Sequence, residues 1–294
     1  MKSRYIFLAI LVFFLIFVRI GPDKQPLSQW IKSTSSHHQQ QNGHAADDSH
    51  AVAHWSYDGE GGPAHWGSLS EGNTLCDAGK KQSPVDLPVT EGACLLPALI
   101  LPEAPMVLAR HYGSVPVNII NNGHTIQLDG NQGGYITLDG LRYDLLQIHF
   151  HSPSEHTVGG KSYPLEAHMV HKSAEGGLAV VGVLMEEGAE NAFLKPMWQG
   201  LPAKADQHFI QKDATLDINA LLPGDETFLT LSGSLTTPPC SEDVRWLVMN
   251  TPVTLSAQQV KQFATLHPGS NRPVQPLNGR AVFVNQAGTL WMVK

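Results

Sequence analysis

The sequence predicts a mainly β fold for the greater part of the 294-residue chain. Short runs of apolar or alternating residues recur from about residue 51 onward, a pattern typical of strands rather than of helices. Glycine and proline are frequent, with 27 and 20 residues, and only 15% of the residues are charged. Such a composition favours many turns between short strands and disfavours a helical bundle.

Residues 1–20 have the composition of a secretory signal. Lys2 and Arg4 precede an unbroken apolar run over residues 5–18, which is the order of charged and apolar residues in a signal peptide. The run is shorter than a typical membrane span, but no small-x-small cleavage site follows closely, and Arg19 comes directly after it. We therefore expect export, by either a cleaved signal peptide or a retained signal anchor.

Residues 21–50 are rich in Gln, Ser and His and offer few side chains for burial. Such a segment cannot offset its ordering entropy, so we expect a disordered linker. Five histidines in and just after it could bind metal ions weakly: His37, His38, His44, His50 and His54. A solvated spacer is the alternative that we favour, because His-rich low-complexity sequence is assigned by composition alone.

Residues 51–294 are expected to form a single domain. Seven runs have strand character: VPVNII at 115–120, YITL at 135–138, LLQIHFH at 145–151, LEAHMVH at 165–171, LAVVGVLM at 178–185, FLTLSG at 228–233 and VRWLVMN at 244–250. The clearest helix is Ser256–Leu266, where Ser256 and Gln259 are spaced as a capping box. We find no internal period of 20–50 residues, which argues against a propeller or a solenoid.

Three histidines are placed to form one metal site. In a strand over residues 145–151, His149 and His151 would point to the same face. A strand over residues 165–171 could pair with it and bring His168 to that face. Three neutral imidazoles leave one corner of a tetrahedral zinc site free, as in catalytic rather than structural zinc sites. A ligand set without oxygen disfavours Ca²⁺ and Mg²⁺.

The neighbours of these histidines support the metal site. Gln147 stands two residues before His149, and Glu166 two before His168, so each can bind the outer ring nitrogen of its histidine. Alternatives stay open: the histidines could lie half exposed on a solvent face, and Glu166 could be an exposed charge. With Glu155, the pair also resembles the H-x-H-x3-E motif of cupins, although the glycine spacing departs from that pattern.

Seven separated motifs resemble the alpha class of carbonic anhydrases in order and spacing: KQSPVDL at 81–87, NNGHT at 121–125, QIHFH at 147–151, SEHT at 154–157, EAHMVH at 166–171, SLTTPPC at 234–240 and RPVQPL at 272–277. The resemblance extends from about His54 to the C-terminus. It implies a large, twisted, mostly antiparallel central sheet of about ten strands with short peripheral helices. The short loop between the histidine pair and Glu155 is similar to that of bacterial members.

The resemblance implies a zinc enzyme for the reversible hydration of CO₂ to bicarbonate and a proton. Its zinc ligands would be His149, His151 and His168, with Gln147 and Glu166 as their hydrogen-bond partners. The family uses zinc-bound hydroxide as the nucleophile. The carbonyl group that supports His151 is not identified by the pattern.

Further roles follow from the same resemblance. Thr236 would orient the hydroxide and donate its own proton to Glu155, which is then not a ligand, and His124 would be the proton shuttle. A substrate pocket would be lined by Val170, Val180, Leu235, Thr237, Val244 and Trp246, and its polar wall completed by Tyr57 and Gln127. Cys76 and Cys240 match a pair that forms a disulfide in bacterial members, whereas Cys94 has no counterpart.

The alternative to an enzyme is a non-catalytic zinc-binding or recognition domain of the same fold. The expected partner is a small molecule, CO₂ or bicarbonate, because a net charge of −7 and a pI near 6.1 argue against a nucleic acid. We expect a periplasmic protein, either soluble after cleavage or anchored to the inner membrane through residues 5–18. The oligomeric state is left open.

Overall fold

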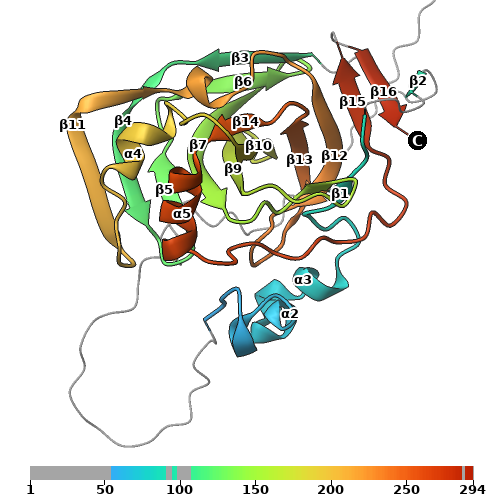
Figure 1. Ribbon diagram of the computed structural model, residues 1–294. Helices are drawn as coiled ribbons and strands as arrows, with labels where there is room; N and C mark the ends of the chain where they lie inside the picture. The colour runs from blue at the N-terminus through green and yellow to red at the C-terminus, as the bar shows by residue number, and fades with distance from the viewer. Residues whose placement is uncertain (1–53, 91–94, 98–106, 287–288, 294) are drawn as a thin grey trace, which may run out of the picture. The chain divides into compact units, whose positions relative to one another are not determined.

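The computed structural model describes residues 54–90, 95–97, 107–286 and 289–293 (Figure 1). The predicted signal segment 1–20, the predicted linker 21–50 and Cys94 lie outside the described residues. Within the described ranges, no helix has the length and apolar character needed to cross a bilayer.

Strands are the dominant elements (Figure 1). They are β1 (Asp86–Leu87), β2 (Leu95–Pro97), β3 (Leu108–Tyr112), β4 (Ser114–Asn121), β5 (Ile126–Asp129), β6 (Gly134–Leu138), β7 (Leu141–His151), β8 (Thr157–Val158), β9 (Leu165–Ser173), β10 (Leu178–Glu187), β11 (Gln207–Asp217), β12 (Phe228–Ser234), β13 (Glu242–Met249), β14 (Val253–Leu255), β15 (Phe283–Gln286) and β16 (Thr289–Val293). Each of the seven runs predicted from the sequence coincides with one of them.

The helices are short. They are α2 (Trp66–Leu69), α3 (Leu75–Ala78), α4 (Leu194–Trp198) and α5 (Ala257–Leu266), with 3-10 turns η1 (Gly59–Gly61), η2 (Glu71–Asn73) and η3 (Ile218–Leu221). The predicted capping box of α5 is confirmed, since the Ser256 hydroxyl accepts from the Gln259 N–H and the Gln259 side chain accepts from the Ser256 N–H. This exchange satisfies two backbone donors that the first turn leaves free.

Fourteen strands form one sheet, in the order β11-β4-β5-β7-β9-β10-β13-β12-β15-β16-β2, with β14 beside β10, β6 beside β7 and β3 beside β6. Most neighbours are antiparallel, but β13 and β14 run parallel to β10. The predicted sheet is thus confirmed, with more strands than the ten or so expected. Strands β1 and β8 form a separate parallel pair.

The middle of the sheet is covered on both faces. Strands β9 and β10 are buried along almost their whole length, which explains why they read as continuous apolar runs. On one face Phe150 of β7 packs against Trp198 of α4 and Phe263 of α5, with ring centroids 5.2 and 6.2 Å away. Because residues alternate along a strand, the neighbours of Phe150 point to the opposite face.

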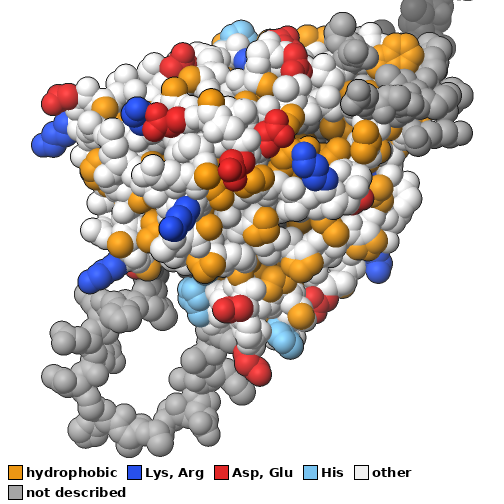
Figure 2. Space-filling view, viewed as in Figure 1, with side chains coloured by type: hydrophobic (Ala, Val, Ile, Leu, Met, Phe, Trp, Pro, Cys, Tyr) orange, Lys and Arg blue, Asp and Glu red, His pale blue; other side chains and the backbone are white. Residues whose placement is uncertain are grey.

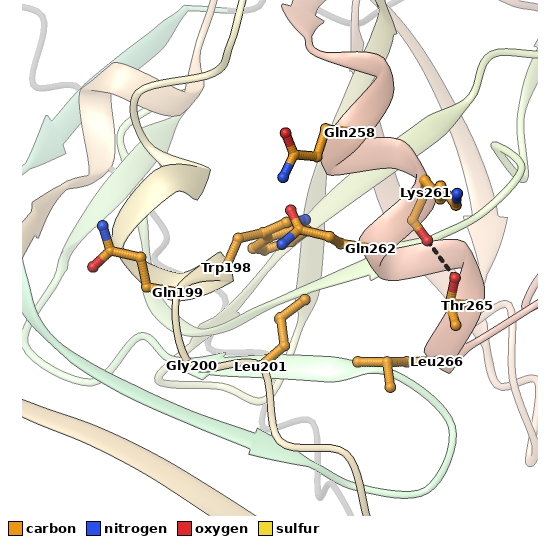
Figure 3. A pocket seen from close by; sticks show the side chains of 9 residues that line it. All are labelled: Trp198, Gln199, Gly200, Leu201, Gln258, Lys261, Gln262, Thr265 and Leu266. Carbon is orange, nitrogen blue, oxygen red and sulfur yellow. Dashed lines mark hydrogen bonds between the residues drawn. The ribbon is translucent and has the colours of Figure 1, made fainter.

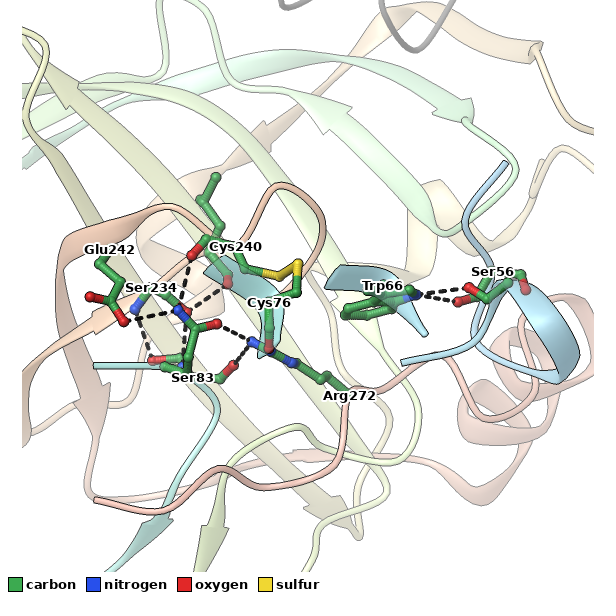
Figure 4. Close-up of a disulfide and its surroundings, with 11 residues drawn as sticks. Ser56, Trp66, Cys76, Ser83, Ser234, Cys240, Glu242 and Arg272 are labelled. Carbon is green, nitrogen blue, oxygen red and sulfur yellow. Dashed lines mark hydrogen bonds between the residues drawn. A yellow bond between two sulfur atoms is a disulfide. The ribbon is translucent and has the colours of Figure 1, made fainter. Parts of the chain in front are cut away.

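A disulfide joins the N-terminal helices to the loop after β12 (Figure 4). Cys76 of α3 is bonded to Cys240, 164 residues later, with a Cα–Cα distance of 5.0 Å. The pairing implied by the family resemblance is therefore confirmed. Beside it Trp66 is fully buried and donates from Nε1 to the carbonyls of Ser56 and Gly61, each at 2.9 Å.

Candidate active site

The three predicted metal ligands lie on two adjacent strands. His149 and His151 are on β7, and in the antiparallel register His149 is directly opposite His168 of β9, while His151 is opposite Glu166. Opposed residues of two strands share a face, as do residues two apart in one strand. The strand pairing expected from the sequence is correct, and it brings the three imidazoles together.

Each imidazole is held through its outer ring nitrogen. Nδ1 of His149 donates to Oε1 of Gln147 at 2.8 Å, as predicted. Nδ1 of His151 donates to the carbonyl of Ser270 at 2.6 Å. Nε2 of His168 donates to Oε1 of Glu166 at 2.9 Å, also as predicted. Since these oxygens can only accept, each outer nitrogen carries a proton, and in the neutral form of each ring the inner nitrogen has a free lone pair.

The inner nitrogens converge. One ring nitrogen from each of His149, His151 and His168 lies within 4.8 Å of the other two, a spacing that can hold one metal ion. Nε2 of His151 is buried and has no hydrogen-bond partner. An unpartnered buried nitrogen is costly unless something binds it, so the donor set fits a metal ion.

Burial keeps two of these imidazoles in the neutral form that binds metals. It lowers the pKa of His149 well below the usual value, and the neighbouring imidazoles lower that pKa further. Burial also lowers the pKa of His151. For His168, burial again acts to lower the pKa, but the charge and hydrogen bond of Glu166 outweigh it and raise the pKa. Glu166 thus has the strongest electrostatic effect on His168.

Glu166 is itself fixed from three sides. Its Oε2 accepts the N–H groups of Glu155 and His156 at 2.9 and 2.8 Å, and its Oε1 accepts from Nδ1 of His156 at 2.8 Å. Burial acts to raise the pKa of Glu166, but His156 and His168 outweigh it and the pKa is well below the usual value. His156, Glu166 and His168 also lie close enough to bind a metal. Their mutual hydrogen bonds occupy those atoms.

The predicted hydrogen bond from Thr236 to Glu155 is not formed. Oε1 of Glu155 accepts the N–H of Arg272 at 2.8 Å, whereas the buried Oε2 has no hydrogen-bond partner. Oε2 faces the triad instead, 3.5 Å from Nε2 of His151 and 3.8 Å from Nδ1 of His168. Oε2 of Glu155 is thus close to the imidazoles and is left without a donor, and Thr236 is buried as well.

The predicted shuttle residue lies in the turn between β4 and β5. The N–H groups of His124 and Thr125 donate to Oδ1 of Asn122, which fixes the turn. The ring of His124 stacks on Trp55 with centroids 3.7 Å apart, and His54 stacks on it at 5.1 Å. Burial, followed by the nearby His54 and His267, lowers the pKa of His124 to about 4.

The apolar residues predicted to line the substrate pocket share the face of the histidines. Gln147 pairs with Val170, Val170 with Val180, and Val180 with Trp246, which forms one row across β7, β9, β10 and β13. Five of the predicted residues belong to one apolar cluster: Val170, Val180, Leu235, Val244 and Trp246. Thr237 lies in the loop after β12, where its carbonyl accepts the N–H of Cys240 at 2.9 Å.

The two residues expected to complete the polar wall lie beside the triad. Gln127 of β5 is paired with His149, and the ring of Tyr57 meets that of His151 edge to face with centroids 6.4 Å apart. Burial, and then the charge of Glu155, raises the pKa of Tyr57 well above its usual value. Its phenol is therefore a neutral hydrogen-bond donor at neutral pH.

Some site residues were not predicted from the sequence. The carbonyl of Ser270 supports His151 from a loop 119 residues later, and His156 supports Glu166. Gly182 was also missed: a Cβ there would lie 3.2 Å from Oε1 of Glu166 and 3.3 Å from Val248. A strand glycine can mark a close approach, so Gly182 carried a usable signal, as did His156 within the SEHT motif.

A surface pocket of about 700 Å³ lies away from these residues (Figure 3). It lies between α4 and α5 and is lined mostly by amide and apolar side chains, including Gln258, Gln262 and Leu201. None of the predicted site residues lines it. The histidine triad is therefore the candidate active site on chemical grounds and not on pocket size.

Comparisons with known proteins show the family of the chain. A family model for eukaryotic-type carbonic anhydrases matches residues 61–286. A carbonic anhydrase of Klebsiella pneumoniae is 48% identical over 235 residues, which cover 79% of this chain and 91% of that protein. One of Pectobacterium carotovorum is 46% identical over 230 residues, covering 78% of this chain and 90% of that protein.

A solved structure shares the fold. The alpha-carbonic anhydrase of Thermovibrio ammonificans, in complex with the inhibitor sulfanilamide, superposes with a TM-score of 0.71 at 43% identity, covering 79% of this chain and 99% of that one. The match of the family model covers well over half of the chain, and it includes the three histidines, Glu155 and Thr236. The chain therefore belongs to the eukaryotic-type, or alpha, carbonic anhydrase family and is a carbonic anhydrase.

Proposed function

We propose that the chain catalyses the reversible hydration of CO₂ to bicarbonate and a proton with one zinc ion held by His149, His151 and His168. The observation that carries this proposal is the convergence of three inner nitrogens within 4.8 Å while every outer nitrogen is already bonded. Three neutral nitrogen ligands suit zinc and leave a position for substrate, whereas Ca²⁺ and Mg²⁺ prefer oxygen. When bound, zinc supplies the Lewis acidity that makes water a nucleophile near neutral pH, chemistry for which carbonic anhydrases are the reference case.

The side chains around the triad orient the reactants. Glu155 Oε2 is the acceptor available to the Thr236 hydroxyl, because it has no other partner. A hydroxyl that donates to a carboxylate can still accept a hydrogen bond from water through its lone pairs. Thr236 and Glu155 together would therefore orient the attacking water. The row of Val170, Val180 and Trp246 offers an apolar surface that suits CO₂ and excludes competing water.

His124 transfers the proton between the site and the solvent. It lies in a turn at the end of β4, where its ring is partly exposed, and imidazole can both take and give a proton at this edge. In this stacked position, burial and then the nearby His54 and His267 lower its pKa to about 4. A ring with so low a pKa accepts protons poorly at neutral pH, so we propose that transfer uses a conformation in which His124 leaves Trp55.

The alternative function is a zinc-binding or recognition domain without catalysis. Stopped-flow measurement of CO₂ hydration separates the two: the zinc-loaded protein should be active, a chelator should abolish the activity, and added zinc should restore it. Zinc bound at one ion per chain without CO₂ hydration would establish the alternative instead.

We also propose that the enzyme is exported to the periplasm, either released or anchored through residues 5–18. The disulfide between Cys76 and Cys240 supports an oxidising compartment. Fractionation of expressing cells tests the proposed export, and recovery of the protein in the cytoplasm would contradict it.

The surface charges support a small-molecule substrate rather than a nucleic acid. On the face shown in Figure 2, Lys, Arg, Asp and Glu side chains are interspersed, and no basic patch stands out.

A further inference from the structure

Arg272 is a buried cation, and the acceptors of its guanidinium hydrogen bonds are all neutral. It is only 2% exposed, and its guanidinium donates to Oε1 of Gln82 and the carbonyl of Ser83, each at 2.8 Å, and to the carbonyl of Cys76 at 2.6 Å (Figure 4). Burial lowers its pKa, which the charge of Glu155 counteracts. A buried charge is costly and persists where its partners compensate for it.

The backbone of the same residue holds the carboxylate of Glu155. The N–H of Arg272 donates to Oε1 of Glu155 at 2.8 Å. Because the guanidinium and this N–H belong to one residue, the groups that fix the guanidinium also fix the position of the Glu155 carboxylate.

Gln82 extends this link to the loop that carries Thr236. Its side chain is 3% exposed; Oε1 accepts from Arg272, and Nε2 donates to the carbonyl of Cys240 at 3.1 Å. The N–H of Cys240 in turn donates to the carbonyl of Thr237 at 2.9 Å. Hydrogen bonds, joined through the covalent bonds of Arg272, Gln82 and Cys240, therefore connect Glu155 to the backbone beside Thr236.

A second connection runs parallel to the first. Arg272 donates to the carbonyl of Cys76, and Cys76 is bonded to Cys240. Arg272 thus reaches Cys240 twice, through the amide of Gln82 and through the disulfide. Two routes between the same end points predict that either one can compensate in part for loss of the other.

We propose that Arg272 and Gln82 are positioning residues that hold the Glu155 carboxylate and the loop of residues 236–240 in a fixed mutual arrangement, with the disulfide as a second, partly redundant link. The inference rests on the roles proposed above for Glu155 and Thr236. These two residues stand on separate segments, so their alignment depends on contacts outside the site. A displacement of about 1 Å in such groups can reduce a rate by about 100-fold.

The test is a comparison of variants that remove one or both links. Gln82→Leu removes the amide link, and Cys76→Ser with Cys240→Ser removes the disulfide; a third protein carries all three changes. Gln259→Leu is the matched control, because Gln259 is also 3% exposed and also holds main-chain groups, those of Asn191, yet has no link to Glu155. Should Gln82→Leu fail to fold, Gln82→Met removes the same side-chain hydrogen bonds, those to Arg272, Cys240 and Glu242, with a side chain of similar length.

Three quantities are measured on each zinc-loaded protein: zinc content, kcat and KM for CO₂ hydration, and hydrogen exchange of the peptide covering residues 234–242. We expect Gln82→Leu to lower kcat/KM about tenfold, mainly through kcat, at full zinc content. In the protein with all three changes, kcat/KM should fall on the order of tenfold further than the product of the two separate decreases. Hydrogen exchange in residues 236–240 should also become faster, and the increase in the protein with all three changes should exceed the combined increases of the two separate variants.

A purely structural role would give a different result. If Gln82→Leu lowers only the melting temperature, as Gln259→Leu should, with kcat/KM and exchange near residue 240 unchanged, the proposal is wrong. It is also wrong if the losses from the two links simply multiply. If the wild-type chain shows no CO₂ hydration, the proposed function is wrong, whatever the variants show. Hydrogen exchange of residues 236–240 then decides by itself whether the amide of Gln82 and the disulfide act together.

Discussion

The imidazole of His124 lies flat on the indole of Trp55, with ring centroids 3.7 Å apart and planes 9° from parallel. This contact buries the residue proposed to transfer protons. Burial is the largest cause of the low pKa of His124, which is about 4.

Replacing Trp55 should therefore change the titration of His124. We expect Trp55→Ala to raise the pKa of His124 from about 4 toward the usual 6.5, as followed by NMR titration of the ring protons. His54→Asn removes a smaller cause and should give a smaller rise. An unchanged pKa in Trp55→Ala would show that the stacked ring is not what suppresses protonation.

The metal ligand and the shuttle should fail in different ways. His151→Ala removes a ligand whose outer nitrogen is fixed by Ser270, so we expect it to abolish activity and most of the bound zinc. His124→Ala should keep one zinc per chain and slow only the proton transfer, so that a higher buffer concentration restores the rate. Metal analysis and stopped-flow assays check this; equal losses of zinc and activity in both variants would contradict the assigned roles.

Buried histidines should make the fold sensitive to acid. Burial lowers the pKa of His171 to about 4, below the 6.5 of an unfolded chain. Its contribution to the unfolding free energy is therefore complete above pH 6.5 and is lost as the pH falls to 4. The loss for this one group is about 3 kcal/mol. His171→Gln can keep the hydrogen bond to Tyr112 and should flatten the pH dependence of the unfolding free energy by that amount. A curve identical to wild type would show that His171 titrates normally.

The disulfide should protect two of the three cysteines. Alkylation of the native protein followed by mass spectrometry should label Cys94 and leave Cys76 and Cys240 unlabelled. Reduction should lower the unfolding free energy by up to roughly 5 kcal/mol, the loop-closure value for a ring of this size. Labelling of Cys76 or Cys240 without reductant would reject the pairing in solution.

Features with a local signal were predictable from the sequence. The period of two in β7 placed His149 and His151 on one face, and the capping residues marked the start of α5. Strand β11 was missed, because its residues are mostly polar and it lies at the edge of the sheet, where even Ile210 is 58% exposed. A strand at the edge of a sheet can be mostly exposed to solvent, so it can consist of polar residues and its sequence then resembles that of a loop.

Contacts between distant segments were not predictable. The carbonyl of Ser270 reaches His151, and the side chains of Gln82 and Arg272 meet although 190 residues separate them. A backbone carbonyl carries no signal in the side-chain pattern, and a lone Arg or Gln is most often exposed. The position of the Glu155 carboxylate likewise depends on the N–H of Arg272, which the motif around Glu155 does not contain.

X-ray absorption at the zinc edge, on protein loaded with one zinc per chain, tests the metal site most directly. We expect three nitrogen ligands at about 2.0–2.1 Å and one oxygen ligand, and loss of one nitrogen in His168→Ala. A sulfur ligand, a protein carboxylate in the fourth position, or a spectrum unchanged by His168→Ala would show that the three imidazoles do not form the catalytic centre.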